Sequence, residues 1–158
     1  MKEKKTLTTE ETREKALKYL EYRAHSEKEL SDKLRRAGAR AEDIESALEF
    51  VQRYNFVNDA DYARRLARDL KKLKKYGSYR IRQELKFKGI SEEYISEAMA
   101  QFEEEDETDA LLPLVEKRLR GNFEQKNIDR VIRYFAYRGY RFEDIKRCVD
   151  IAKDEGEI

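Results

Sequence analysis

The chain has 158 residues, of which 44% are charged and 39% hydrophobic, and its 35 Lys or Arg against 34 Asp or Glu give a formal net charge of +1. One proline and six glycines among so many charged residues favour solvated helices and argue against several unlike domains. The single cysteine, Cys148, excludes an internal disulfide, and neither the charged segment 1–18 nor the short apolar stretch 110–115 resembles a signal peptide or a membrane span, so we expect a cytoplasmic protein.

The predicted helices follow one another in groups of three. Leading helices are expected over 10–24, over 59–75 and over about 109–120, the last with Pro113 near its start. Each is followed by a short middle helix and then by a third helix with apolar residues at i, i+3, i+4 and i+7. The middle helix of the first group begins at a capping box formed by Ser26 and Glu29, and Ser78 and Asn127 are expected to cap its two counterparts.

One pattern recurs in all three groups: two apolar residues four apart, a glycine four further on, and an isoleucine six beyond it. Its glycines, Gly38, Gly89 and Gly139, lie 51 and 50 residues apart and are interpreted as left-handed helix stops. Self-similarity at this period predicts an all-α fold, an elongated array of three tandem three-helix repeats. We expect a tail over 1–9 and repeats over 10–57, 58–105 and 106–154, although the period also permits a compact helical bundle. Cys148 takes the position of Ala47 and Ala98 and is predicted to be a core residue.

Positive and negative charges are segregated in the middle repeat. Segment 64–88 has eleven Lys or Arg and two acids, whereas segment 89–109 has nine acids and no Lys or Arg. A basic stripe interleaved with Tyr76, Tyr79 and Phe87 suits contacts with phosphates, bases or an acidic partner. The alternative is that these charges are solvated helix faces that pair with the neighbouring acids.

Familiar catalytic motifs are missing from the sequence. His25 is the single histidine, no Cys/His cluster exists, and no glycine-rich phosphate loop follows a strand. We therefore expect neither an enzyme nor a metal or cofactor, and a structural role for His25. The acidic run 103–109 lacks the spacing of a calcium loop and is interpreted as a solvated linker between repeats.

The chain resembles the RecX family of recombination regulators over about residues 13–153. The R-x-x-S-x-x-E-L-x-x-K-L-x-x-x-G segment of that family is similar to Arg23, Ser26, Glu29, Leu30, Lys33, Leu34 and Gly38. Its G-[YF]-[LI]-[DN]-D-x-x-[YF]-A segment is similar to residues 55–63, with Asn55 in place of the glycine. Two further matches are Gly77, Arg80, Ile81, Glu84, Leu85, Lys88, Gly89 and Ile90 in the middle repeat, and Arg138, Gly139, Tyr140 and Ile145 in the third.

The resemblance implies a regulator of the RecA recombinase that lies in the groove of the RecA nucleoprotein filament and inhibits, or otherwise tunes, filament growth, ATP hydrolysis and strand exchange. We expect a monomer, with single-stranded DNA as a further partner and no membrane contact. The residues expected to contact the partner are Arg64, Arg65, Arg68, Lys71, Lys72, Arg80, Arg82, Lys86 and Lys88, together with Arg23 and Tyr62. Asp59 and Asp61 are expected to cap the fourth helix. The alternatives are a helical protein that binds nucleic acid directly and an adaptor for another protein.

Overall fold

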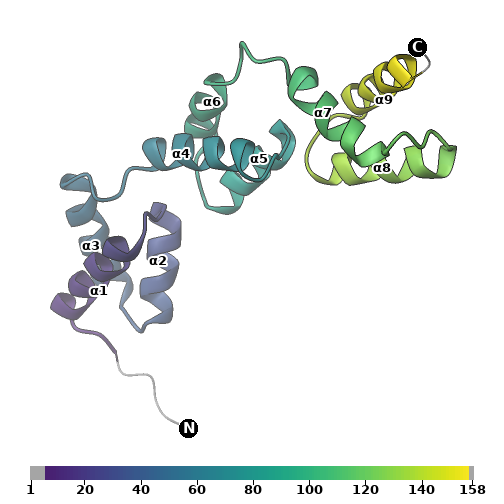
Figure 1. Cartoon of the computed structure of the whole chain (residues 1–158). Helices are drawn as coiled ribbons and strands as arrows, with labels where there is room; N and C mark the ends of the chain where they lie inside the picture. The colour runs from purple at the N-terminus through teal and green to yellow at the C-terminus, as the bar shows by residue number, and fades with distance from the viewer. Residues whose placement is uncertain (1–5, 157–158) are drawn as a thin grey trace, which may run out of the picture. The chain divides into compact units, whose positions relative to one another are not determined.

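A computed structural model describes residues 6–156, and these residues form nine α-helices and no strand (Figure 1). The helices are α1 (Thr9–Tyr22), α2 (Glu27–Arg36), α3 (Ala41–Arg53), α4 (Asp59–Lys72), α5 (Ser78–Phe87), α6 (Glu92–Ala100), α7 (Glu107–Leu119), α8 (Gln125–Tyr137) and α9 (Phe142–Gly156). The predicted all-α fold of three-helix repeats is confirmed. Residues 1–5 of the predicted tail lie outside the described residues.

The chain forms two compact units that share the middle repeat. The first unit is Met1–Arg65 with Leu85–Ala98, and the second is Leu66–Glu84 with Met99–Ile158. Helices α4 and α5 are each divided between the two units. The core of the first repeat is built from the buried face of α1, α2 and α3, including Leu30, Leu34 and Val51, because these apolar residues recur at helical spacing.

The third repeat has a core of its own, formed by residues of α7, α8 and α9. Val115, Phe135 and Ile145 are buried there, and Cys148 is fully buried among them, as predicted. The Cys148 Sγ lies 3.7 Å from the carbonyl oxygen of Thr108, and burial raises the pKa of this thiol to about 11. Cys148 is therefore a packing residue rather than a reactive one.

The three pattern glycines end their helices as predicted. Gly38, Gly89 and Gly139 have φ of 101°, 80° and 100°, and each lies two residues beyond the end of α2, α5 or α8. In each case the amide after the glycine donates to the carbonyl five residues earlier, at 3.0, 3.2 and 3.1 Å, and the acceptors are Leu34, Leu85 and Phe135. These bonds are those of a Schellman motif, which satisfies the last carbonyls of a helix.

Several predicted helix starts need correction. The capping box of Ser26 and Glu29 is present, but α8 begins at Gln125, so Asn127 lies inside that helix. Ser78 is the first residue of α5, and its hydroxyl donates to Glu107 Oε1 at 2.8 Å instead of capping. An equivalent sequence position in another repeat does not determine the capping residue, because the cap depends on which side chain reaches the first free amides of the helix.

Helix α4 begins at Asp59 as predicted, but its capping residue differs from the prediction, and α7 begins earlier than predicted. Asn58 caps α4, because its Oδ1 accepts a hydrogen bond from the Asp61 amide at 3.0 Å. Asp59 Oδ1 instead accepts from the Glu27 amide at 2.9 Å, at the start of α2. Helix α7 starts at Glu107, capped by Asp106, and Pro113 lies in its middle rather than near its start.

Two equivalent joints connect neighbouring repeats. In the first unit, the Ser26 hydroxyl donates to the carbonyl of Lys88 at 2.6 Å, immediately before Gly89. In the second unit, the Gly77 amide donates to the carbonyl of Arg138 at 2.9 Å, immediately before Gly139. A Cβ on Gly77 would lie 2.4 Å from the Gly139 oxygen, so the absence of side chains permits this close backbone approach.

Candidate functional site

The predicted basic stripe is exposed in the first unit on α4 and α5. Arg64, Arg65 and Lys86 are exposed there. Arg65 Nε pairs with Asp61 Oδ2 at 3.1 Å and Lys86 Nζ with Glu92 Oε1 at 3.4 Å, but the two cationic side chains keep 71% and 73% of their surface open to solvent. Exposed pairs of this kind contribute little to stability, so both cations can exchange their acid for one on a partner.

In the second unit, Arg68 and Lys72 lie four residues apart on one face of α4, and Arg82 lies on α5. All three side chains are exposed, and none forms an ion pair within the described part of the chain. Tyr79, which is 63% exposed, lies on the same helix as Arg82. These residues offer the charges and the aromatic surface that the sequence predicts for partner binding.

Three other stripe residues are occupied by internal contacts. Lys71 is 18% exposed, pairs with Glu105 at 2.6 Å and lies 4.3 Å from the centre of the Phe102 ring. Arg80 is 22% exposed, donates to Glu84 at 3.0 Å and to the Tyr137 carbonyl at 3.3 Å. The structure therefore gives Lys71 and Arg80 structural partners, and the same holds for Lys88 in the network below.

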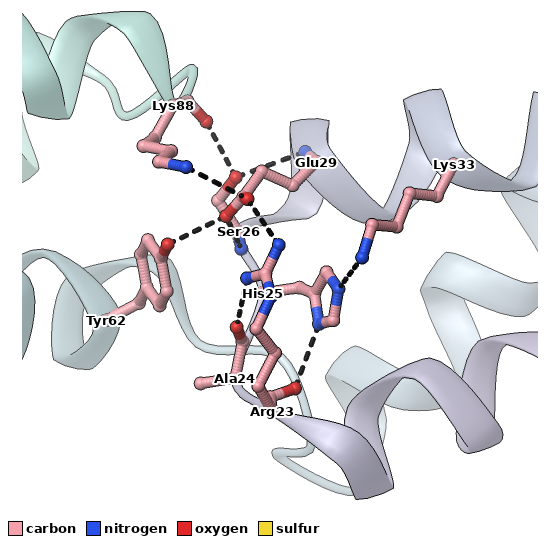
Figure 2. A network of polar contacts seen from close by, with 8 residues as sticks. All are labelled: Arg23, Ala24, His25, Ser26, Glu29, Lys33, Tyr62 and Lys88. Carbon is pink, nitrogen blue, oxygen red and sulfur yellow. Dashed lines mark hydrogen bonds and ion pairs between the residues drawn. The ribbon is translucent and has the colours of Figure 1, made fainter.

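Arg23, Tyr62 and Lys88 converge on one carboxylate, that of Glu29 (Figure 2). The Tyr62 hydroxyl donates to Glu29 Oε1 at 2.7 Å, while Arg23 Nη2 and Lys88 Nζ donate to Oε2 at 3.0 and 3.2 Å. The Ser26 amide donates to Oε1 at 3.2 Å. The network thus links the start of α2 to α4 and to the turn after α5, all within the first unit.

The network changes the acidity of its members. Burial alone raises the pKa of Glu29, but the hydrogen bonds from Tyr62, Ser26 and Arg23 outweigh it and lower the pKa to about 2. Burial and the bond to Glu29 raise the pKa of Tyr62 well above its usual range. Glu29 is thus ionised and Tyr62 neutral near pH 7, which makes the network a structural joint. The sequence shows the capping role of Glu29 but carries no signal for its distant partners.

His25 belongs to the same region and has a structural role, as expected. Its side chain is buried at 2% exposure, its Nδ1 lies 2.9 Å from the Arg23 carbonyl, and Lys33 Nζ lies 2.8 Å from its Nε2. Burial lowers the pKa of His25. A neutral ring that donates from Nδ1 and accepts at Nε2 satisfies both contacts.

Residues 6–156 contain no group of three or more His, Cys, Asp or Glu side chains placed to hold a metal ion. Part of the acidic run is structural rather than a free linker, because Glu105 pairs with Lys71 and Asp106 caps α7. None of the helices in the described chain combines the length and apolar character needed to cross a membrane.

Three-helix repeats, close contacts between them and exposed cations on α4 and α5 define a helical repeat protein with an exposed basic surface. The family models described as the RecX first and second three-helix domains match residues 13–50 and 58–99. The chain belongs to the RecX family, whose members are regulatory, non-enzymatic proteins. The sequence-based assignment to this family is confirmed.

Relatives match the chain over most of its length. A protein named regulatory protein RecX from Vibrio parahaemolyticus is 32% identical over 98% of this chain and 100% of its own length. A protein of the same name from Clostridium botulinum is 34% identical over 87% of this chain, which spans only 66% of the length of that relative. The crystal structure of RecX from Lactobacillus salivarius has the same fold, with a TM-score of 0.79 at 20% identity over 91% of this chain and 96% of that one.

Proposed function

We propose that this protein binds the RecA–DNA filament in its groove and inhibits filament growth, ATP hydrolysis and strand exchange. The observation that carries the proposal is membership of the RecX family along almost the whole chain. The proposal includes action as a monomer in the cytoplasm, without a cofactor. A regulator shifts its target toward the state that it binds more tightly. If this protein binds the non-growing state of the filament more tightly than the growing state, the population of growing filaments falls by mass action.

The exposed cations on α4 and α5 support contact with acidic groups of the recombinase. Arg68, Lys72 and Arg82 are exposed and form no ion pair among the described residues. Complementary charges raise the association rate and select the partner, and their effect is screened over about 8 Å at physiological salt. We therefore assign the first contact with the filament to these three residues.

The test is DNA-dependent ATP hydrolysis by RecA, measured with increasing amounts of the purified protein. We expect the protein alone to hydrolyse no ATP and to lower the RecA rate at or below stoichiometric amounts. The variant R68E/K72E/R82E should inhibit poorly, whereas K146E/R147E/K153E, with the same change in charge on exposed positions of α9, should inhibit normally. An unchanged RecA rate at saturating wild-type protein would rule out the proposed function.

Direct binding of nucleic acid by the same surface is the second candidate function. Tyr79 and Phe87 on α5 favour it, since they are 63% and 77% exposed beside cations and can stack on bases. The two candidates differ in a control with bare single-stranded DNA. If the variant R68E/K72E/R82E loses affinity for bare DNA in proportion to its loss of inhibition, the surface acts on DNA rather than on RecA.

A further inference from the structure

A cationic cavity lies between the third repeat and the turn after α4, and Lys75 is its one lining residue from the basic segment 64–88. It has a volume of about 550 Å³ and lies entirely in the second unit, between α7, α8 and the turn after α4. Apolar side chains, among them Val131 and Phe135, form part of its wall. Its cationic lining residues are Lys75, Lys117, Arg118, Arg120, Arg130 and Arg138. No acidic side chain lines it among the described residues.

No ion pair among residues 6–156 neutralises the charges around this cavity. Lys117, Arg120 and Arg130 are exposed, and none of the six lining cations takes part in an ion pair within the described chain. Asp129, the sequence neighbour of Arg130, instead accepts from Gln125 Nε2 at 2.8 Å. Like charges gathered around one hollow repel one another and raise the local positive potential, so an anion bound there relieves a cost already present in the fold.

Two of the guanidinium groups are held in place by an aromatic ring. Arg118 Cζ lies 3.3 Å from the centre of the Tyr134 ring, and Arg138 Cζ lies 5.4 Å from the same centre. Arg138 also donates to the carbonyl of Lys74. A guanidinium stacked on a ring loses conformational freedom but keeps its N–H edge for a ligand, so less entropy is lost when an anion binds.

Backbone conformation brings two more cations to the cavity. Lys75 and Arg120 have φ of 58° and 53°, in the left-handed region that glycine and asparagine adopt most easily. Arg120 ends α7 in this conformation. Long cationic side chains thus occupy two strained positions, and both of them line the same cavity.

We propose that this cavity is a binding site for the phosphate groups of single-stranded DNA. A phosphodiester backbone carries a charge on every link, so a short stretch of it can meet six cations, whereas a peptide can do so only if nearly every residue is acidic. Arginine is suited to phosphate through paired hydrogen bonds. The cavity volume of about 550 Å³ is in the range of natural ligand sites. The proposal concerns the affinity of this chain for DNA alone and does not rest on regulation of RecA.

The test is fluorescence anisotropy with a labelled oligothymidylate, without RecA, over a series of salt concentrations. The variant K117Q/R130Q removes two exposed lining cations, and K146Q/R147Q removes one Lys and one Arg from exposed positions of α9 that do not line the cavity. We expect the cavity variant to lower the slope of log affinity against log salt by about 1.4, or about 0.7 for each lost contact. At about 50 mM salt its affinity should fall on the order of tenfold for each contact. The α9 variant should bind like the wild type.

Other results would overturn the assignment. Equal loss of affinity in both variants would mean that charge acts without a defined site, and unchanged binding by the cavity variant would mean that DNA binds elsewhere. Titration with a labelled polyglutamate peptide covers the remaining case, because loss of peptide binding with intact DNA binding would assign the cavity to an acidic protein. Circular dichroism and thermal melting of both variants establish that each is folded, since the four substituted side chains are exposed.

Discussion

Glu29→Gln tests whether the Glu29 network stabilises the fold through charge. The substitution keeps the shape of the side chain and an oxygen that can accept from Tyr62 at the 2.7 Å position. It removes the negative charge that faces Arg23 and Lys88 at 3.0 and 3.2 Å. The variant therefore isolates the ionic part of the network from its packing.

The expected magnitude follows from the acidity of Glu29. Its pKa of about 2, compared with an ordinary 4.5, corresponds to about 3 kcal/mol of stability at pH 7. Because Arg23 and Lys88 are 40% and 29% exposed, solvent screening reduces this figure, and we expect Glu29→Gln to cost about 2 kcal/mol.

The stabilisation from the Glu29 carboxylate should increase with pH. A carboxyl whose pKa is lower in the folded state contributes its full stability above pH 4.5 and loses it as the pH falls toward 2. Urea unfolding followed by circular dichroism should thus show a free-energy difference between wild type and variant that is largest at pH 7 and nearly vanishes near pH 2. Glu27→Gln is the control, since the Glu27 side chain is exposed in the same first turn. A difference for Glu29→Gln that is equal at both ends of this pH range would refute the ionic explanation.

Two matched pairs of substitutions extend the test to the second unit. Gly139→Ala should lower the free energy of unfolding by about 3 kcal/mol or more in urea, because the new Cβ would lie 2.4 Å from the Arg80 amide nitrogen. Gly121→Ala, which also has a positive φ but open space around it, should lower it by only about 1 to 2 kcal/mol. Equal losses for the two variants would contradict the close-contact explanation. Arg80→Ala should lower the free energy of unfolding by about 1 to 2 kcal/mol, since its side chain contacts Glu84 and the Tyr137 carbonyl, and Arg82→Ala should leave it within about 0.5 kcal/mol. A smaller loss for Arg80→Ala than for Arg82→Ala would show that the internal contacts of Arg80 carry no stability.

The sequence reveals those features of the fold that local backbone chemistry determines. A glycine two residues after an amphipathic segment signals a left-handed helix end, and Gly38, Gly89 and Gly139 all have that conformation. Asn55, which replaces a family glycine, likewise has a positive φ of 59°. Helix starts are less predictable, because Ser78 and Asn127 are drawn into other contacts by their surroundings.

The candidate site is only partly visible in the sequence, because a count of charges does not show how the fold pairs them. Lys71 and Arg80 look like other members of the stripe, yet Glu105 and Glu84 take up their charges. The cationic cavity illustrates the opposite case. Its lining residues are spread from Lys75 to Arg138, so no single run of sequence indicates them, and only the packing of α7, α8 and the turn after α4 brings them together.

The joints between repeats depend mainly on backbone carbonyls. The contacts at Lys88 and Arg138 are made by their backbone carbonyls, which accept from Ser26 and Gly77. Side chains add to the joint in the first unit, because Arg23, Lys88 and Tyr62 donate to Glu29 there, and the charges of these two cations are used inside the protein. The helix-ending glycine therefore has two roles in the second and third repeats. It ends its helix in a left-handed conformation, and its lack of a side chain lets the start of a helix from the neighbouring repeat pack closely against it. Arg82 is exposed and takes no part in either of these joint contacts, so we expect its substitution to leave the fold intact.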